Sequence, residues 1–132
     1  MSYDISFCRF ERGGAAPVDE AALLAAVAPF VVDREPVFHF LRLRTPDGGE
    51  AEVYTGRDVG PLMGFTLSRF SGGAVSDLIV AVARATDTVI LAPGCPTLVM
   101  RADQRQHLPT ELAEHAVIVA TGADFDAVLR AG

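Results

Sequence analysis

The sequence predicts an α+β domain with an open, mainly antiparallel sheet and helices on one face, of the ferredoxin-like kind with a C-terminal extension. Three observations carry this prediction: two strand–helix units over 3–30 and 64–86, a hairpin between them, and short strand and helix signals after them. The chain has 132 residues, which fits one globular domain over 1–132.

The first unit joins a strand to a buried helix. Residues 3–10 alternate, with Ile5 and Phe7 on one face, which predicts a strand. Residues 18–30 follow Pro17 and have apolar residues at helical spacing. Because this stretch is rich in alanine all round, the sequence predicts a helix with little exposed surface.

The strongest local pattern is a β-hairpin. Segments 37–45 and 50–55 are joined by Pro46-Asp47-Gly48-Gly49, a composition typical of tight turns. A symmetric register pairs Arg44 with Glu50, Leu43 with Ala51, Arg42 with Glu52 and Leu41 with Val53. One face then carries an Arg/Glu ladder and the other face is aliphatic. Each cross-strand charge pair contributes about 0.2–1 kcal/mol.

The remaining segments alternate between short apolar runs and helical stretches. After a Gly- and Pro-rich loop over 56–64, the sequence predicts a strand over 64–70, a helix over 74–86, strands over 88–92 and 97–100, a short helix over 109–115, a strand over 116–121 and a last helix over 124–130. Residues 101–107 are polar and are assigned to no element.

Composition excludes several classes of protein. Half of the residues are hydrophobic and the net charge is -6, which excludes intrinsic disorder and disfavours nucleic acid as a partner. All 11 basic residues are arginine, a bias typical of GC-rich bacterial genomes. The longest apolar run, 21–32, is shorter than the ~20 residues of a membrane span. With no visible signal peptide and only two cysteines, we expect a cytoplasmic protein with reduced thiols and no membrane partner.

A polar cluster near the C-terminus is a candidate metal site. On a continuous helix, His107, Glu111, Glu114 and His115 would share one face, as zinc ligands do. Pro109 favours a helix that begins after His107, which separates the two histidines. We therefore predict no metal and no cofactor.

Three further positions are candidates for chemistry. His39 is in phase with the aliphatic face of the hairpin and could serve as a general base beside a cleft. Cys95 lies in a Pro-Gly-Cys-Pro turn without a nearby histidine to activate it. Ser71-Gly72-Gly73 precedes a predicted helix and could bind an anion. We predict no catalytic residue, and keep as the alternative a small enzyme or ligand-binding protein with a cleft near His39 or Cys95.

The face of the hairpin that carries the Arg/Glu ladder is instead a predicted interaction surface. Its members are Phe38, Phe40, Arg42, Glu52 and Tyr54. Exposed aromatic side chains clustered on one sheet face indicate a buried contact. We expect this face to be covered by segment 116–130 or by a second copy of the chain, which would give a twofold homodimer.

The opening Met1-Ser2-Tyr3-Asp4-Ile5, followed by an aromatic strand, resembles that of small bacterial proteins of the toxin-immunity type. The resemblance covers about the first ten residues and includes no catalytic motif. It implies a protein that binds and neutralises a toxin domain. Together with the interaction surface, it favours a non-enzymatic cytoplasmic protein-binding domain, either immunity-like or self-associating.

Overall fold

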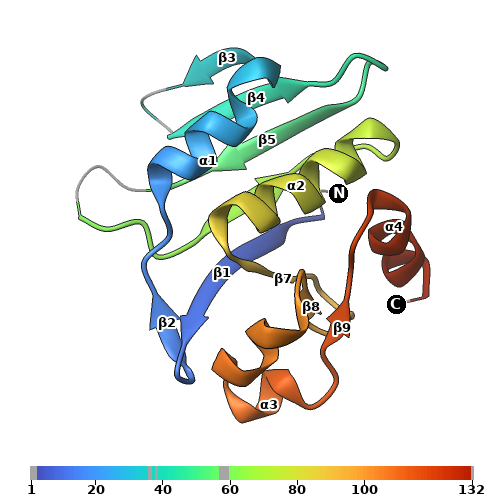
Figure 1. Ribbon diagram of the computed structural model, residues 1–132. Coiled ribbons are helices and arrows are strands. Elements are labelled where there is room, and N and C mark those ends of the chain that lie inside the picture. Colours follow the sequence, from blue (N-terminus) through green and yellow to red (C-terminus); the bar gives the residue numbers. More distant parts are fainter. Residues whose placement is uncertain (1–2, 36, 38, 57–59, 132) are drawn as a thin grey trace.

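The computed structural model describes residues 3–35, 37, 39–56 and 60–131, and these form an α+β architecture (Figure 1). The strands are β1 (Ile5–Glu11), β2 (Gly14–Ala16), β3 (Val31–Glu35), β4 (Phe40–Arg44), β5 (Glu50–Tyr54), β6 (Phe65–Ser68), β7 (Val89–Leu91), β8 (Leu98–Val99) and β9 (Val117–Ile118). The helices are α1 (Glu20–Val27), α2 (Ala74–Thr86), α3 (Thr110–Ala113) and α4 (Gly122–Ala131), with the 3-10 turns η1 (Ala28–Phe30) and η2 (Ala102–His107).

The described strands form one open sheet in the order β3-β4-β5-β6-β1-β7-β8-β9, with β2 paired to β1. Neighbouring strands are antiparallel, except that β8 and β9 are parallel. The predicted α+β class with a mainly antiparallel sheet is therefore confirmed. The ferredoxin-like topology stays a prediction.

The β4–β5 hairpin has the predicted register. Arg42 pairs with Glu52 and Arg44 with Glu50 across the two strands. Leu43 lies between them on the opposite face and is buried. Because side chains alternate along a strand, this register directs the aliphatic residues to the core and the charged residues away from it.

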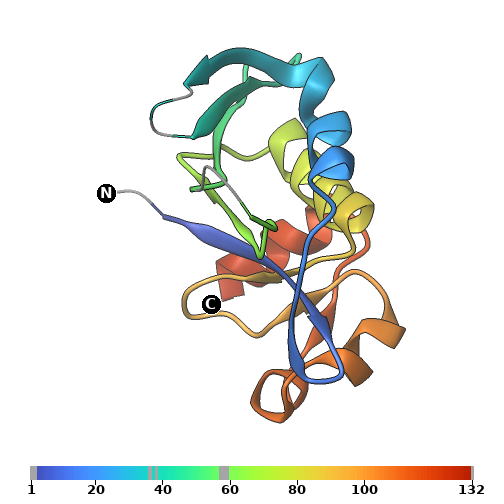
Figure 2. The same ribbon diagram turned by 90° about the vertical axis from the view of Figure 1, so that its left-hand side faces the viewer.

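Two cores lie on opposite faces of the sheet. Helices α1 and α2 lie on the same side of the sheet (Figure 2), and α4 packs against α2. The main core lies between these helices and the sheet and includes the fully buried Phe7 and Ile79. A smaller core contains Val89 and Leu108, and its cover comes from η2 and α3. Val89 pairs with Cys8, which points away from the main core.

This arrangement leaves one face of β4, β5 and β6 without a helical layer among the described residues. We call it the open face. It consists of the side chains that alternate with the core residues on these strands and on the start of β1. The β7–β9 end of the sheet, by contrast, is covered on both faces.

Several predicted boundaries were wrong. The helix predicted over 18–30 is α1 followed by η1, because Pro29 has no N–H to continue an α-helix. The strand predicted over 116–121 has two residues, and α4 begins at Gly122, two residues earlier than predicted. Residues 101–107, which the sequence assigned to no element, include the whole of η2.

Two strands were not predicted. Strand β2 forms a hairpin with β1 where Gly13-Gly14 predicted a strand end. Strand β3 pairs with β4 at the edge of the sheet, with a bulge between Val31 and Asp33. Within the described residues, no helix combines the length and the apolar character that a membrane span needs.

Candidate functional site

The open face carries a row of four charges that crosses the sheet. Asp33 on β3 pairs with Arg42 on β4, which pairs with Glu52 on β5. Arg69 follows β6 and reaches back to the same glutamate. The ion-pair distances are 3.6 Å from Arg42 Nη1 to Asp33 Oδ2, 3.5 Å from Arg42 Nη2 to Glu52 Oε2, and 3.7 Å from Arg69 Nε to Glu52 Oε1. The signs along this charged row therefore alternate.

Glu52 is the best-covered member of the charged row. Its residue is only 7% exposed, whereas the side chains of Arg42 and Arg69 are 43% and 73% exposed. The Tyr54 hydroxyl also donates a hydrogen bond of 2.9 Å to Glu52 Oε1. Burial, together with this bond and the charge of Glu52, raises the pKa of Tyr54. Glu52 thus has three partners, Arg42, Arg69 and Tyr54, whose side chains cover it.

A second charge pair lies beside the row. Arg44 Nη2 is 3.1 Å from Glu50 Oε1, and both side chains are more than half exposed, at 55% and 56%. Arg42, Arg44, Arg69, Glu50 and Glu52 together line a hollow of about 280 Å³. The wall is charged and open, so it offers ionic contacts rather than an apolar pocket.

Phe40 and Tyr54 form the described aromatic part of this surface. Phe40 and Tyr54 lie side by side with ring centroids 5.0 Å apart, and both are half-buried. The Arg42 guanidinium lies 6.0 Å from the centre of the Phe40 ring. Phe38, the third predicted aromatic residue, lies outside the described residues. The structure therefore brings Phe40, Arg42, Glu52 and Tyr54 together on one face.

The C-terminal segment does not cover the open face. Strand β9 is at the far edge of the sheet from β3, β4 and β5. Helix α4 packs on α2, on the opposite side of the sheet from the open face. The sequence analysis expected the face to be covered either by segment 116–130 or by a second copy of the chain. The described residues of segment 116–130 do not cover it.

Two members of the charged row were missed by sequence reasoning. Asp33 belongs to a strand that was not predicted, because 31–35 is a short run with three consecutive charged residues. Arg69 follows β6 with a left-handed φ of 51°, which turns it toward Glu52. No local pattern marks either contact, since both depend on which strands are neighbours.

The histidines and acids near the C-terminus are dispersed. His107 ends η2, where its Nδ1 accepts a 3.4 Å hydrogen bond from the Arg12 N–H. His115 is highly exposed, and its Nε2 lies 3.9 Å from Glu114 Oε1. Among the described residues, no group of three His, Cys, Asp or Glu side chains is placed to hold a metal ion.

The two cysteines occupy different surroundings. Cys8 lies on β1 on the side of the open face, and burial raises the pKa of its thiol. Cys95 is half-buried, and the Tyr3 hydroxyl is 3.8 Å from its sulfur. Within the described residues, no hydrogen bond from a histidine to Cys95 is present. The geometry therefore does not support Cys95 as an activated nucleophile.

The predicted anion site before α2 contains an anion of the chain itself. Asp47 Oδ2 accepts a 3.0 Å hydrogen bond from the Ala74 N–H at the start of the helix. The Ser71 hydroxyl accepts a bond from the Glu50 N–H. The Ser71-Gly72-Gly73 segment thus joins α2 to the hairpin turn, and the Asp47 carboxylate occupies the position predicted for a ligand.

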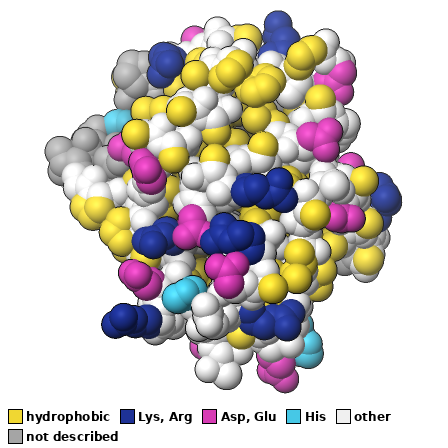
Figure 3. Space-filling model, in the orientation of Figure 1, with side chains coloured by type: hydrophobic (Ala, Val, Ile, Leu, Met, Phe, Trp, Pro, Cys, Tyr) yellow, Lys and Arg dark blue, Asp and Glu magenta, His cyan; other side chains and the backbone are white. Residues whose placement is uncertain are grey.

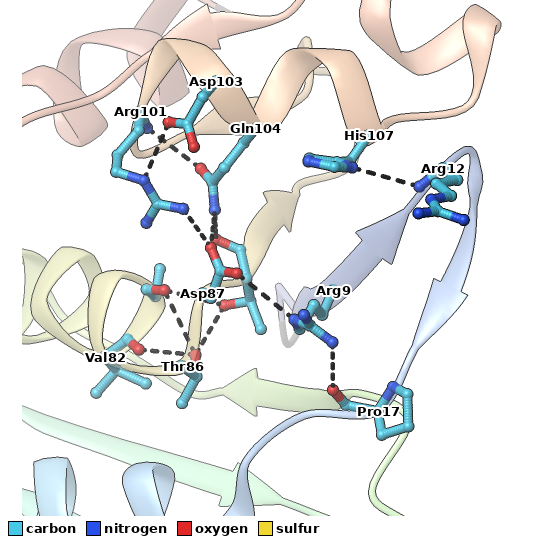
Figure 4. A network of polar contacts seen from close by, with 12 residues as sticks. Arg9, Arg12, Pro17, Val82, Thr86, Asp87, Arg101, Asp103, Gln104 and His107 are labelled. Atoms are coloured by element: carbon cyan, nitrogen blue, oxygen red, sulfur yellow. Dashed lines mark hydrogen bonds and ion pairs between the residues drawn. The ribbon is translucent and has the colours of Figure 1, made fainter.

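A polar network at the other end of α2 is structural (Figure 4). Asp87 Oδ1 accepts from Arg101 Nη2 at 2.6 Å and from Gln104 Nε2 at 3.1 Å, and Arg9 Nε lies 3.5 Å from Oδ2. Burial acts to raise the pKa of Asp87, but these donors lower it overall. The adjoining cavity is only about 60 Å³. The network therefore fastens η2 to the sheet and leaves little room for a ligand.

No protein-family model, curated protein or solved structure matches the chain. The N-terminal resemblance to the toxin-immunity type accordingly stays a prediction from the first residues.

Proposed function

We propose that this chain is a non-enzymatic protein-binding domain that associates with a second copy of itself through the open face. The supporting observation is the charged row, Asp33-Arg42-Glu52-Arg69, in which the signs read minus, plus, minus, plus across the sheet. Such a row changes sign about its own midpoint. A surface with this property is complementary to a copy of itself.

The geometry of the twofold axis follows from the strand order. Consider an axis parallel to the strands, midway between β4 and β5, with two sheets stacked about 10 Å apart. The axis places β4 of one copy over β5 of the other. Arg42 then faces the partner's Glu52, and Arg44 faces the partner's Glu50. The same operation brings Asp33 opposite the partner's Arg69.

The aromatic pair obeys the same symmetry. Phe40 pairs with Tyr54 in the hairpin register, so each ring would face the other type of ring in the partner. Their remaining exposed edges would be buried at the end of the interface, where aromatic side chains contribute strongly. The proposal therefore uses both the ionic and the aromatic parts of the open face.

Charge reversal with two exposed residues tests this axis. Arg44→Glu places two glutamates opposite each other in the homodimer, and Glu50→Arg places two arginines there. We expect each variant alone to weaken the dimer at least about tenfold, which corresponds to about 1.4 kcal/mol. In an equimolar mixture, the introduced glutamate of one variant faces the introduced arginine of the other. The symmetry-related contact keeps the original Arg44 and Glu50, so the heterodimer should recover.

The measurement is mass by light scattering or sedimentation as a function of concentration, with a monomer of 14.0 kDa as reference. Circular dichroism confirms that each variant is folded. Arg130→Glu, on α4, is the matched control and should leave the mass unchanged. A wild-type chain that is monomeric at all accessible concentrations overturns the proposal, and so does a mixture of the two variants that stays monomeric.

A second candidate function, the binding of a small ligand near His39, is favoured by one observation. His39 lines a cavity together with Glu20 and Leu24 of α1.

A further inference from the structure

A polar groove follows β6 on the open face. It consists of two hollows, of about 290 and 390 Å³, which share Tyr54 and Thr66 as lining residues. The first hollow extends to Ser6 on β1, and the second extends to Asp4 and Arg69. The larger volume lies within the about 300–1,000 Å³ range of small-molecule pockets. Figure 3 shows the other side of the molecule, where hydrophobic side chains gather over α1.

The groove exists because short side chains follow a large one across the sheet. Tyr54 on β5 pairs with Thr66 on β6, and Thr66 pairs with Ser6 on β1. Neighbouring strands are about 4.8 Å apart, so these three side chains form one row. Past β1, η2 and α3 cover the β7–β9 end of the sheet. The two small hydroxyl residues therefore form a depression between the Tyr54 ring and this cover.

The lining of the groove has unused hydrogen-bonding capacity. Among the described residues, no group is hydrogen-bonded to the hydroxyls of Ser6 and Thr66. Each hydroxyl can donate one hydrogen bond and accept two. The buried Ser68 hydroxyl donates a 2.7 Å bond to Asp4 Oδ1, which fixes the Asp4 carboxylate and leaves its second oxygen as an acceptor. Donors and acceptors thus lie together along the groove.

The charges at the groove do not favour an ionic ligand. Asp4 and Arg69 line the larger hollow and have opposite charges. Tyr54 adds no charge at neutral pH, because burial and its hydrogen bond to Glu52 raise its pKa above the usual value near 10. A lining of hydroxyls with balanced charges is suited to a neutral ligand that is itself rich in donors and acceptors.

The Tyr54 ring adds an apolar surface to this lining. Phe40, on β4, lies 5.0 Å from one side of the ring, measured between ring centroids. Thr66 is its neighbour on β6, so the second side of the ring borders the groove. The face of an aromatic ring is negatively polarised, and the C–H groups of a sugar ring can therefore pack against it.

We propose that the groove binds a small neutral saccharide. The C–H face of the sugar lies against Tyr54, and its hydroxyls exchange hydrogen bonds with Ser6, Thr66 and Asp4. A sugar hydroxyl both donates and accepts, as this mixed lining requires. The site does not rest on self-association, although Tyr54 belongs to both surfaces. In the dimer proposed above, the sugar competes with the partner copy for this ring.

Three probes separate the contributions of hydroxyls, ring and charge: methyl β-D-glucoside, methyl β-D-glucuronide and cyclohexanol. Amide chemical shifts of the isotope-labelled full chain report affinity and location. We expect the glucoside to bind at millimolar concentration, with shifts centred on Ser6, Tyr54 and Thr66. Cyclohexanol, which lacks all but one hydroxyl, should bind at least about tenfold more weakly. The charged glucuronide should bind no more tightly than the glucoside.

Three outcomes overturn the saccharide site: cyclohexanol that binds as tightly as the glucoside, a glucuronide that binds more tightly, or shifts that centre elsewhere or are absent at tens of millimolar glucoside. Because chemical shifts report binding in a monomer as well as in a dimer, this result is separate from the test of self-association. A chain that dimerises without binding the sugar refutes the saccharide site alone.

Variants at Thr66 complete the test. Thr66→Val keeps the shape of the side chain but removes its hydroxyl, and should weaken the glucoside about threefold to tenfold. Thr110→Val, on α3, is its control. Thr66→Tyr fills the groove and should abolish binding, whereas Val32→Tyr, at an exposed position of β3, should not. Valine and tyrosine both favour strands, so the variants at Thr66 should fold. If Thr66→Val binds like Thr110→Val, or Thr66→Tyr still binds the glucoside, the assignment is wrong.

Discussion

At the scale of single residues, Asp47 shows how one side chain connects two elements. Its carboxylate accepts hydrogen bonds from the Thr45 hydroxyl at 2.5 Å, the Gly49 N–H at 3.1 Å and the Ala74 N–H at 3.0 Å. The residue before α2 is Gly73, with a φ of 71° and no side chain to cap the helix. Asp47 therefore acts as the missing cap from the hairpin turn.

These bonds lower the pKa of Asp47 to about 2, with the Thr45 hydroxyl as the largest cause. Because the pKa is lower in the folded chain than in the unfolded chain, ionised Asp47 stabilises the fold at neutral pH. That contribution is fully present above about pH 4 and is lost as the pH falls toward 2. The direction follows from proton binding, since the unfolded chain takes up the proton first.

We expect Asp47→Ala to lower the melting temperature by a few degrees at pH 7, because α2 loses its cap. The difference from wild type should shrink as the pH is lowered from 4 to 2, where wild type also loses the carboxylate. Thermal denaturation followed by circular dichroism at several pH values measures both effects. Glu114→Ala, an exposed acidic control, should change little. A difference that stays constant down to pH 2 would contradict this role.

Residue pairings within the hairpin were predictable, whereas the contacts of Asp47 with α2 were not. The partners of Arg42 and Arg44 lie within about ten residues, and the turn sets their register. Asp47 and Ala74 are 27 residues apart. No spacing rule connects such positions, so the sequence indicated an anion at α2 without indicating that the chain supplies it.

At the scale of elements, the two edges of the sheet are protected differently. The edge strand β3 has a bulge and the consecutive charged residues Asp33, Arg34 and Glu35, both of which discourage pairing with another strand. The edge strand β9 is apolar, with Ile118 51% exposed. The backbone groups on either side of β9 are instead hydrogen-bonded to side chains.

Three side chains cover the backbone on either side of β9. Arg105 donates a short hydrogen bond to the Ala116 carbonyl, and Arg84 donates one of 3.0 Å to the Ala120 carbonyl. Asp124 Oδ2 accepts the Ala120 N–H at 3.0 Å. Within this described part of the chain, a narrow stretch of backbone around Ile118 is left for pairing with another strand.

We expect the double variant Arg84→Ala/Arg105→Ala to aggregate several-fold faster than wild type on mild heating, because two edge carbonyls become available to other chains. Thioflavin-T fluorescence and light scattering at a fixed temperature below the melting transition measure the rate. Arg130→Ala removes an arginine of α4 without touching this edge and serves as control. Equal aggregation rates for the double variant and the control would show that the arginines do not protect β9.

The elements that could be predicted from the sequence are those with strong local patterns. The long helix α2 and the β4–β5 hairpin were predicted because periodicity and turn residues agree over many positions. Strand β2 has only three residues, Gly-Ala-Ala, and is held by pairing with β1 and by the Gly13 N–H bond to the His107 carbonyl. Such an element depends on tertiary contacts, so its own residues carry no strand signal.

At the scale of the whole molecule, helical elements cover some strands on both faces and others on one face, and this difference explains where the candidate sites lie. Among the described residues, the β7–β9 end has helical elements on both faces, whereas β4, β5 and β6 have them on one face. The charged row lies on the uncovered part, and residues of α1, β3 and β4 line the cavity beside His39. Segment order alone could not predict this, since it depends on how α3, η2 and α4 fold back.

The docking of α4 onto α2 completes the main core and depends on a glycine. Phe125 of α4 is fully buried, and the Ser76 hydroxyl donates a 2.6 Å bond to Asp126 Oδ1. At Gly122 the helices are so close that an added Cβ would lie 2.6 Å from the Asp77 nitrogen and 2.9 Å from the Ser76 carbonyl carbon. These are backbone atoms of α2, which cannot move aside without disturbing the helix.

Gly122→Ala should therefore push α4 away from α2 and loosen the packing of Phe125. Overpacking of this kind costs about 1–3 kcal/mol, which denaturant unfolding of the variant would measure. Gly72→Ala is the matched control, because an added Cβ at Gly72 meets no atom within 4 Å. Amide hydrogen exchange should accelerate in α4 and in the first half of α2 for the Gly122 variant, and stay unchanged in β4 and β5. If exchange rose evenly across the whole chain, α4 would unfold only with the rest of the domain, and the contact at Gly122 would not act locally.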